Sequence, residues 1–188
     1  AETGSGLEAV LEDDVGQLWL GTYNTGVVRL RMPPTENNGR AALAQLDRFG
    51  TAHGLPSVNY NLVNPIDGEA RFATSAGMYR FEKERNRFEP DPSFASLFGQ
   101  ARVVYVAHQD PSKRVWLYAE DAARGLKETG LARQQTAAPY RWDGNMLSAL
   151  NGHETMTTYG DPNGVVWFGS DDGLFRLDPR LPKNYAQP

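Results

Sequence analysis

The chain has 188 residues and a formal net charge of −4, with 40% hydrophobic and 22% charged residues. This balance supports a packed core and argues against global disorder. The absence of cysteine excludes disulfides and thiol catalysis. Because the chain carries neither a basic block nor a run of roughly 18 apolar residues, we expect no nucleic-acid partner and no membrane contact within it.

Strands and turns dominate the expected secondary structure. The chain contains 8 Phe, 8 Tyr and 4 Trp, whose flat rings suit a pleated sheet. It also contains 19 Gly and 12 Pro, so turns are frequent and long helices are disfavoured. The chain begins without an initiator methionine or a signal-peptide pattern, and we therefore expect it to be a piece of a longer protein.

A motif near the start of the chain predicts the first sheet. The pattern predicts strands over 6–11, 17–22 and 27–30, and a fourth, outer strand over 44–49. Between the first two strands, Asp13 supplies an acceptor for turn amides and glycine takes a positive φ without steric cost.

The same motif recurs along the chain, with glycine three residues and tryptophan six residues after the aspartate. One close copy lies near the C-terminus, one copy keeps only the aspartate-to-tryptophan step, and one has phenylalanine in place of tryptophan. The structural repeat residues are Asp13, Gly16, Trp19, Phe72, Asp110, Trp116, Asp161, Gly164 and Trp167. The spacing of the aromatics is typical of four-stranded propeller blades.

These repeats predict an all-β fold, a β-propeller fragment of about four blades that are four-stranded antiparallel meanders. One such sheet cannot bury both faces, so we expect blades to stack with the repeat aromatics between them. The predicted partial propeller spans 1–179, with an exit linker over 180–188. The predicted blades cover 1–49, 50–98, 99–148 and 149–179. Of the long connections 32–43, 85–100 and 119–139, we expect some to project from blade edges, with a helical turn over 119–129.

The motifs resemble the two-component regulator propeller repeat family, whose pattern is Asp-x-x-Gly-x-hydrophobic-Trp-hydrophobic-Gly-Thr-x-x-Gly-Leu-x-Arg. The first copy matches it, with one extra residue before Gly26, at Asp13, Gly16, Trp19, Gly21, Thr22, Gly26 and Arg29. The last copy matches it at Asp161, Gly164, Trp167, Gly169, Gly173, Leu174 and Arg176. The segment Gly54-Leu55-Pro56-Ser57 is similar to the element between repeats. In that family, the repeats form large propellers in the periplasmic or extracellular sensor part of membrane-spanning signalling proteins. A small β-sandwich, a membrane helix and a histidine kinase or diguanylate cyclase commonly follow.

The resemblance implies that this chain is a non-catalytic sensor or ligand-binding segment from the C-terminal part of such a propeller, in the periplasm or outside the cell. Its ligand would be an unidentified small molecule or a glycan. A propeller binds ligands where loops of several blades converge. The candidate loops contain Tyr23, Asn24, Thr25, Tyr60, Asn61, Ser75, Ala76, Asp171 and Asp172. Trp142 fits either a sugar-stacking platform or, preferably, a packed outer strand.

Two alternatives remain open. The first is a protein-interaction or dimerisation scaffold, because a four-blade fragment has two uncovered blade faces that would bind the remaining blades or another copy. The second, which we disfavour, is a propeller hydrolase or lyase.

The sequence gives little sign of catalytic or metal chemistry. The acidic turns 12–14 and 171–172 lack the closing bidentate carboxylate of a metal loop, and His53, His108 and His153 have no ligand spacing. We therefore expect no catalytic residue, no metal and no cofactor.

Overall fold

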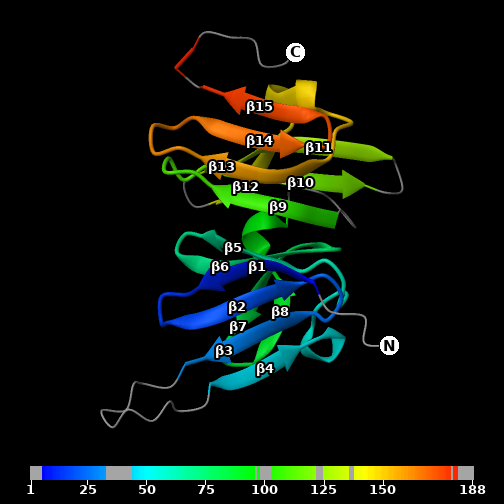
Figure 1. Ribbon diagram of the computed structural model, residues 1–188, viewed down its shortest axis with the longest axis vertical. Coiled ribbons are helices and arrows are strands. Elements are labelled where there is room, and N and C mark those ends of the chain that lie inside the picture. The colour runs from blue at the N-terminus through cyan, green and yellow to red at the C-terminus, as the bar shows by residue number, and fades with distance from the viewer. Residues whose placement is uncertain are drawn as a thin grey trace.

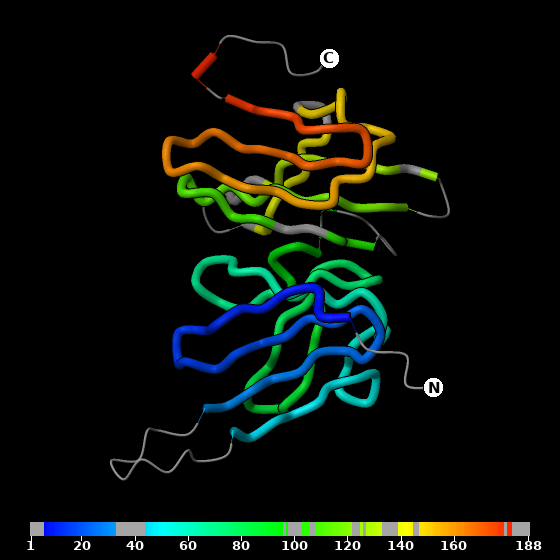
Figure 2. Tube along the Cα trace, viewed as in Figure 1, coloured from blue at the N-terminus to red at the C-terminus, as the bar shows by residue number. Residues whose placement is uncertain are grey.

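The computed structural model describes residues 6–32, 44–95, 97, 103–121, 125–135, 138–178 and 180–181. Within these residues, four separate antiparallel sheets are built, each from strands that are consecutive in the sequence. Blades 1 and 2 form the lower half of the molecule in Figure 1 and blades 3 and 4 the upper half, and the tube in Figure 2 shows the same order. The chain therefore has the predicted β-propeller architecture of about four blades.

The strands fall into these four blades in chain order. Blade 1 comprises β1 (Leu7–Glu12), β2 (Gln17–Thr22), β3 (Val27–Arg31) and β4 (Gln45–Phe49). Blade 2 comprises β5 (Leu62–Ile66), β6 (Glu69–Thr74), β7 (Gly77–Glu82) and β8 (Arg87–Pro90). Blade 3 comprises β9 (Val103–Gln109), β10 (Val115–Asp121), β11 (Leu126–Gln135) and β12 (Ala138–Asp143). Blade 4 comprises β13 (Thr155–Gly160), β14 (Val166–Ser170) and β15 (Gly173–Leu177), three strands within the described residues where four were predicted.

Three short 3-10 helices complete the described secondary structure: η1 (Thr51–His53), η2 (Pro92–Phe94) and η3 (Asn145–Leu150). None of the helices in the described part of the chain is long and apolar enough to cross a membrane. The predicted helical turn over 119–129 is wrong for the described residues of that segment, because 119–121 lie in β10 and 126–129 in β11, with Asp121 paired with Leu126; residues 122–124 lie outside the described residues. In the connection over 85–100, Phe94 and Leu97 are buried and do not project. Residues 33–43 and 182–188 lie outside the described residues.

The repeat aspartates of blades 1 and 3 each have two roles in their turn. One carboxylate oxygen of Asp13 accepts from the backbone amides of Val15 and Gln17, over 3.1 and 2.9 Å, as predicted. The other accepts from the indole nitrogen of Trp19 at 2.9 Å. The six-residue spacing therefore lets one side chain close the turn and satisfy a buried indole. The same indole bond joins Trp116 to Asp110 at 3.0 Å and Trp167 to Asp161 at 3.2 Å.

Trp19 lies between blade 1 and blade 2. It is 3% exposed, and its ring centroid lies 5.3 Å from that of Phe72 and 5.1 Å from that of Phe81. Phe88 of β8 packs edge-on at 6.4 Å. Each fully buried large side chain of this kind contributes about 1.5–3 kcal/mol by leaving water. This interface is the aromatic core that holds the first two blades together.

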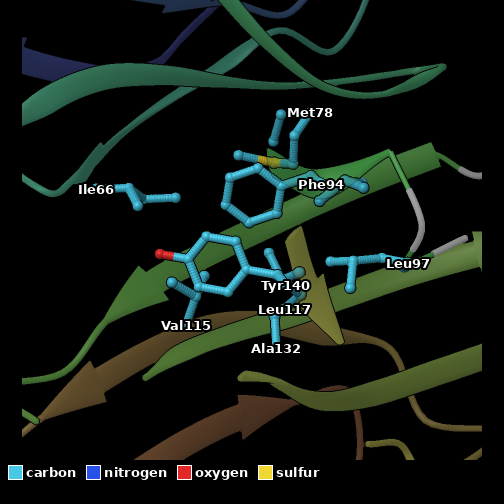
Figure 3. Close-up of a cluster of buried hydrophobic side chains, with 11 residues drawn as sticks. Ile66, Met78, Phe94, Leu97, Val115, Leu117, Ala132 and Tyr140 are labelled. Atoms are coloured by element: carbon cyan, nitrogen blue, oxygen red, sulfur yellow. The ribbon is translucent and has the colours of Figure 1, made fainter. Parts of the chain in front are cut away.

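Blades 2 and 3 meet through a different cluster, which Figure 3 shows. Phe94 of η2 stacks on Tyr140 of β12 with ring centroids 4.5 Å apart, between Met78 of blade 2 and Leu117 of blade 3. Blades 3 and 4 return to the tryptophan pattern, because Trp116 packs edge-on against Phe168 at 5.6 Å.

The structure corrects the place of Phe72 in the repeat. Arg71 pairs with Arg80 in the sheet as Trp19 pairs with Arg29, so Arg71 occupies the tryptophan position of blade 2. Phe72 is one residue further along and points to the opposite face, since side chains alternate along a strand. It does pack between blades, as predicted, but it covers the tryptophan of the preceding blade.

Each blade therefore has two unlike faces. The tryptophan face is the one on which Trp19, Trp116 and Trp167 lie in blades 1, 3 and 4. The closing face is the opposite one, which in blade 2 carries Phe72 and covers Trp19. Trp167 was predicted to pack between blades. It is only partly buried, because the described residues provide no blade beyond its face.

Candidate ligand-binding site

Three blades end their second strand in the same turn, which a hydroxyl group closes. The hydroxyl donates to the carbonyl of the glycine before or at the start of the third strand: Thr22 to Gly26 at 2.7 Å, Thr74 to Gly77 at 2.8 Å and Ser170 to Gly173 at 3.3 Å. In an antiparallel sheet the first strand begins beside these turns. We call this end of the blades the loop end; it contains all the candidate loops predicted from the sequence.

Tyr23 of blade 1 and Tyr60, which precedes β5 of blade 2, meet at the loop end. Their ring centroids lie 4.5 Å apart and their hydroxyl oxygens 2.5 Å apart. The Tyr60 amide donates to the Tyr23 carbonyl at 2.9 Å and holds Tyr60 at a φ of 53°, a conformation that bulky residues avoid. The two side chains remain 43% and 37% exposed, so both present aromatic surface to solvent.

The aromatic contact continues into blade 3. Tyr105 of β9 lies 5.9 Å from Tyr60, and Tyr118 of β10 lies 5.7 Å from Tyr105, between ring centroids. The Tyr118 hydroxyl donates to Glu120 at 2.5 Å. We call Tyr23, Tyr60, Tyr105 and Tyr118 the tyrosine row; it links three consecutive blades at one end of the molecule.

Charged groups continue from the row toward blade 4. The Lys127 ammonium lies 3.9 Å from Glu120 and 3.5 Å from Glu154, which precedes β13. The Glu154 amide in turn donates to the predicted site residue Asp171 at 3.1 Å. His153 lies 3.6 Å from the same carboxylate. Among the residues that the structure describes, no three His, Asp or Glu side chains gather as a metal site would require.

Three phenols of the row, those of Tyr60, Tyr105 and Tyr118, have a raised pKa. Burial, and then the Glu120 carboxylate, raises the pKa of Tyr105 to about 12 and raises that of Tyr118 as well. The hydrogen bond with Tyr23 raises the pKa of Tyr60. At physiological pH these three hydroxyl groups are therefore neutral.

Other predicted site residues build the loops. Asn61 is fully buried, and its side-chain amide donates to the carbonyls of Ser57 and Asn59 over 3.1 and 3.3 Å. Asn24 is partly buried in the blade 1 turn, and Asp172 is exposed in the blade 4 turn. Ser75 and Ala76 occupy the equivalent turn of blade 2, where the Ala76 amide donates to the Thr74 hydroxyl.

Sequence reasoning missed five members of this region: Tyr105, Tyr118, Glu120, Lys127 and Glu154. One of them left a signal. Tyr118 follows Trp116 by two residues, where Gly21 and Gly169 stand in the close copies of the motif. The tyrosine at this glycine position departs from the repeat, and the departure indicates that Tyr118 has a separate role.

Trp142 lies away from the row. It is partly buried against the cluster between blades 2 and 3, and a side chain on Gly130 would come within 2.6 Å of its indole. This is the packed outer-strand position that the sequence favoured over a sugar platform.

A small cavity of about 80 Å³ lies at the other end of blades 1 and 2, beside the Asp13 turn. Two of the charged groups that line it are already engaged within the protein: Asp13 with Trp19, and Arg71 with Asp91 at 2.6 Å. The tyrosine row is therefore the better candidate for ligand binding.

No family model matches the chain, and a search of the curated proteins finds no match. Solved structures do match. One is a crystal structure of the extracellular domain of BT4673 from B. thetaiotaomicron, a candidate one component system, with 16% identity and a TM-score of 0.61. Another, of the same domain as a candidate hybrid two component system, has 17% identity and a TM-score of 0.63. This chain is covered to 96% in both matches but spans only 24% of those chains. The likeness shows a shared fold.

Proposed function

We propose that this chain is a non-catalytic, ligand-binding part of a sensor that lies in the periplasm or outside the cell and belongs to a membrane-bound signalling protein. The observation that carries the proposal is the tyrosine row, in which the rings of Tyr23, Tyr60 and Tyr105 come together from three blades at the loop end, with Tyr118 buried beside Tyr105. The likeness to extracellular domains of candidate signalling systems supports the sensor role. The output domain would be a histidine kinase or a diguanylate cyclase.

The chemistry of the row suits a glycan. Exposed tyrosine rings stack on the apolar faces of sugar rings, and their hydroxyl groups both donate and accept. Carboxylates such as Glu154, which is 49% exposed, accept hydrogen bonds from sugar hydroxyl groups. A ligand that spans the row would contact several blades at once, and its binding would then change how the blades sit together.

The engaged state of the charged groups supports a binding role without chemistry. Glu120 already accepts from Tyr118 and lies near Lys127, so its carboxylate is committed to structure. A hydrolase would need two carboxyl groups facing one another across a cleft, with one pKa raised.

Calorimetric titration with a panel of neutral, amino and acidic oligosaccharides tests the proposal. Tyr60→Asn removes the ring while keeping a residue that tolerates a positive φ. We expect binding to weaken about tenfold, which corresponds to about 1.4 kcal/mol. Tyr159→Ala is the matched control, because Tyr159 is 59% exposed in blade 4 and lies outside the row. Equal affinity for the Tyr60→Asn variant, or no binding of any panel member, would contradict the proposal.

A second function has its own observation. The two outermost blade faces are uncovered, with Val10 of blade 1 55% exposed and Leu174 of blade 4 69% exposed. Such faces suit a scaffold that binds further blades or another copy.

A further inference from the structure

An exposed carboxylate of blade 1 lies beside the first tyrosine of the row. A β-carbon on Gly6 would lie 3.6 Å from the Tyr23 β-carbon and 3.7 Å from a Glu8 carboxylate oxygen, so the two side chains flank the same glycine. Glu8 is exposed and occupies the position where β1 shifts its register against β2. Met156 occupies the matching position of blade 4. The carboxylate is therefore a property of blade 1 and not of the repeat.

The Glu8 charge reaches the second tyrosine of the row, and a carboxylate of blade 4 does so as well. The hydrogen bond with Tyr23 is the largest cause that raises the pKa of Tyr60, and the charges of Glu8 and Glu154 add to it. Glu154 is 49% exposed and lies 3.5 Å from the ammonium of Lys127. Carboxylates therefore approach the exposed Tyr23–Tyr60 pair from two different blades.

Lys127 does not balance this negative charge. Its ammonium lies 3.5 Å from Glu154 and 3.9 Å from Glu120, so one positive charge is shared by two carboxylates. Glu8 adds a third carboxylate on the side of blade 1. The charged groups placed against the row in the described part of the chain therefore sum to a negative charge.

The loops that carry the row also hold hydrogen-bond acceptors that have no donor. Asn24 follows Tyr23 and Asn61 follows Tyr60 in the sequence. The side-chain oxygen of each is buried and has no hydrogen-bond partner among the described residues. Asn61 is fully buried, and its side-chain nitrogen already donates to two backbone carbonyls. Because buried polar groups normally find partners, these loops are short of donors and not of acceptors.

An ammonium group matches these surroundings. It has three donors and no acceptor, so it complements carboxylates and amide oxygens. A cation is also attracted to the face of an aromatic ring, and the rings of Tyr23 and Tyr60 are 43% and 37% exposed. A uronic or sulfated sugar would instead bring like charge against Glu8 and Glu154. The row therefore favours a cationic ligand over an anionic one.

We propose that the tyrosine row binds an amino sugar, whose protonated amine lies beside the Glu8 carboxylate at the exposed rings of Tyr23 and Tyr60. This inference rests on the proposed glycan-binding function and narrows its ligand class. The rings supply the affinity that any glycan shares. Glu8 supplies the discrimination between a charged amine and a neutral group at the same position of the sugar.

Calorimetric titration of the full chain with two matched oligosaccharides tests the inference. One is a β-1,4-linked tetramer of glucosamine, and the other is the same tetramer with every amine acetylated. At mildly acidic pH, where the amines are protonated, we expect the glucosamine tetramer to bind about tenfold more tightly. Added salt should reduce this preference, because the charges are exposed to solvent.

Glu8→Gln removes the charge and keeps the shape of the side chain. It is expected to lower the preference for the amine about threefold and to leave the affinity for the acetylated tetramer unchanged. Glu12→Gln is the matched control, because Glu12 is an exposed carboxylate at the other end of the same strand, near Gly16 of the Asp13 turn. It should leave both affinities unchanged.

The outcomes separate this inference from the function on which it rests. The acetylated tetramer or an acidic glycan binding as tightly as the glucosamine tetramer, with the binding weakened by Tyr60→Asn, would overturn the amino-sugar inference and support glycan binding. A Glu8→Gln variant that retains the full preference would also overturn it. A chain that binds no oligosaccharide would overturn both.

Discussion

Trp19 and Trp167 come from the same motif and differ only in what covers them. Each accepts an arginine over its ring and donates its indole N–H to the motif aspartate. Trp19 is 3% exposed because blade 2 closes over it, whereas Trp167 is partly exposed on the last described blade. The comparison shows that each repeat supplies one side of an interface, and that the neighbouring blade must supply the other side. Stability in this fold arises between neighbouring blades.

Alanine substitution at Trp19 and Trp167 should give the largest difference in stability between the two sites. Trp19→Ala leaves a cavity among four phenylalanine rings and is expected to lower the free energy of unfolding by about 3–5 kcal/mol. Trp167→Ala is expected to cost about 1 kcal/mol or less, since its ring already meets water. Urea denaturation at a protein concentration where the chain is monomeric measures both. Equal losses would mean that the two faces are equally covered.

Substitution of the aspartates that accept from the tryptophan indoles should also cost more stability at the covered site than at the open one, with smaller losses than at the tryptophans. The Asp110 side chain is fully buried, so Asp110→Ala leaves the buried indole of Trp116 without an acceptor. We expect a loss of about 2 kcal/mol. Asp161→Ala should cost about 1 kcal/mol or less, because water reaches Trp167. Asp110→Asn, which keeps an acceptor, serves as the control. The order would be refuted by a larger loss at Asp161.

The contact between blades 3 and 4 should be sensitive to pH. His108 of β9 packs against Gly160 of β13, and burial lowers the pKa of His108 below 6.5, although Asp110 partly offsets this. The unfolded chain therefore binds a proton more readily than the folded one. The contribution of neutral His108 to the free energy of unfolding is present above pH 6.5. It is lost as the pH falls toward the pKa of His108 in the folded chain. Denaturation series between neutral and mildly acidic pH should show this loss, and His108→Gln should reduce it.

The smallest expected change in stability comes from a substitution in a turn of blade 3. Lys113 has a φ of 62°, where Gly16 and Gly164 have 77° and 85° in the matching turns. Lys113→Gly removes the strain of a left-handed side chain and forgoes only an exposed ion pair with Asp67. We expect a gain of about 0.5–1 kcal/mol in a thermal or urea melt. A loss of stability would indicate that the ion pair outweighs the strain.

The strands of blade 1 and the turn role of Asp13 could be predicted from the sequence, because both depend on local spacing. The register of blade 2 could not. Ile66 pairs with Glu69 across a two-residue turn, and this shortening moves Arg71 into the tryptophan position. In a pattern of period two, a shift by one residue exchanges the faces.

The tyrosine row was only partly predictable for a related reason. Tyr23 and Tyr60 could be proposed because they lie in loops that flank core strands. Their contact joins residues 37 apart in the sequence, and Tyr105 and Tyr118 lie inside strands where pattern alone indicates packing. Such contacts depend on how whole blades stack, which local spacing does not specify.

The central claim is that each tryptophan face is completed by the closing face of a following blade. Fluorine NMR of the chain labelled with fluorotryptophan tests it directly, because the four tryptophans give separate signals. In dilute solution, the Trp167 signal should respond to exchange of H₂O for D₂O, and that of Trp19 should not. A Trp19 signal that responds as strongly as that of Trp167, or a Trp167 signal as protected as that of Trp19, would contradict the account.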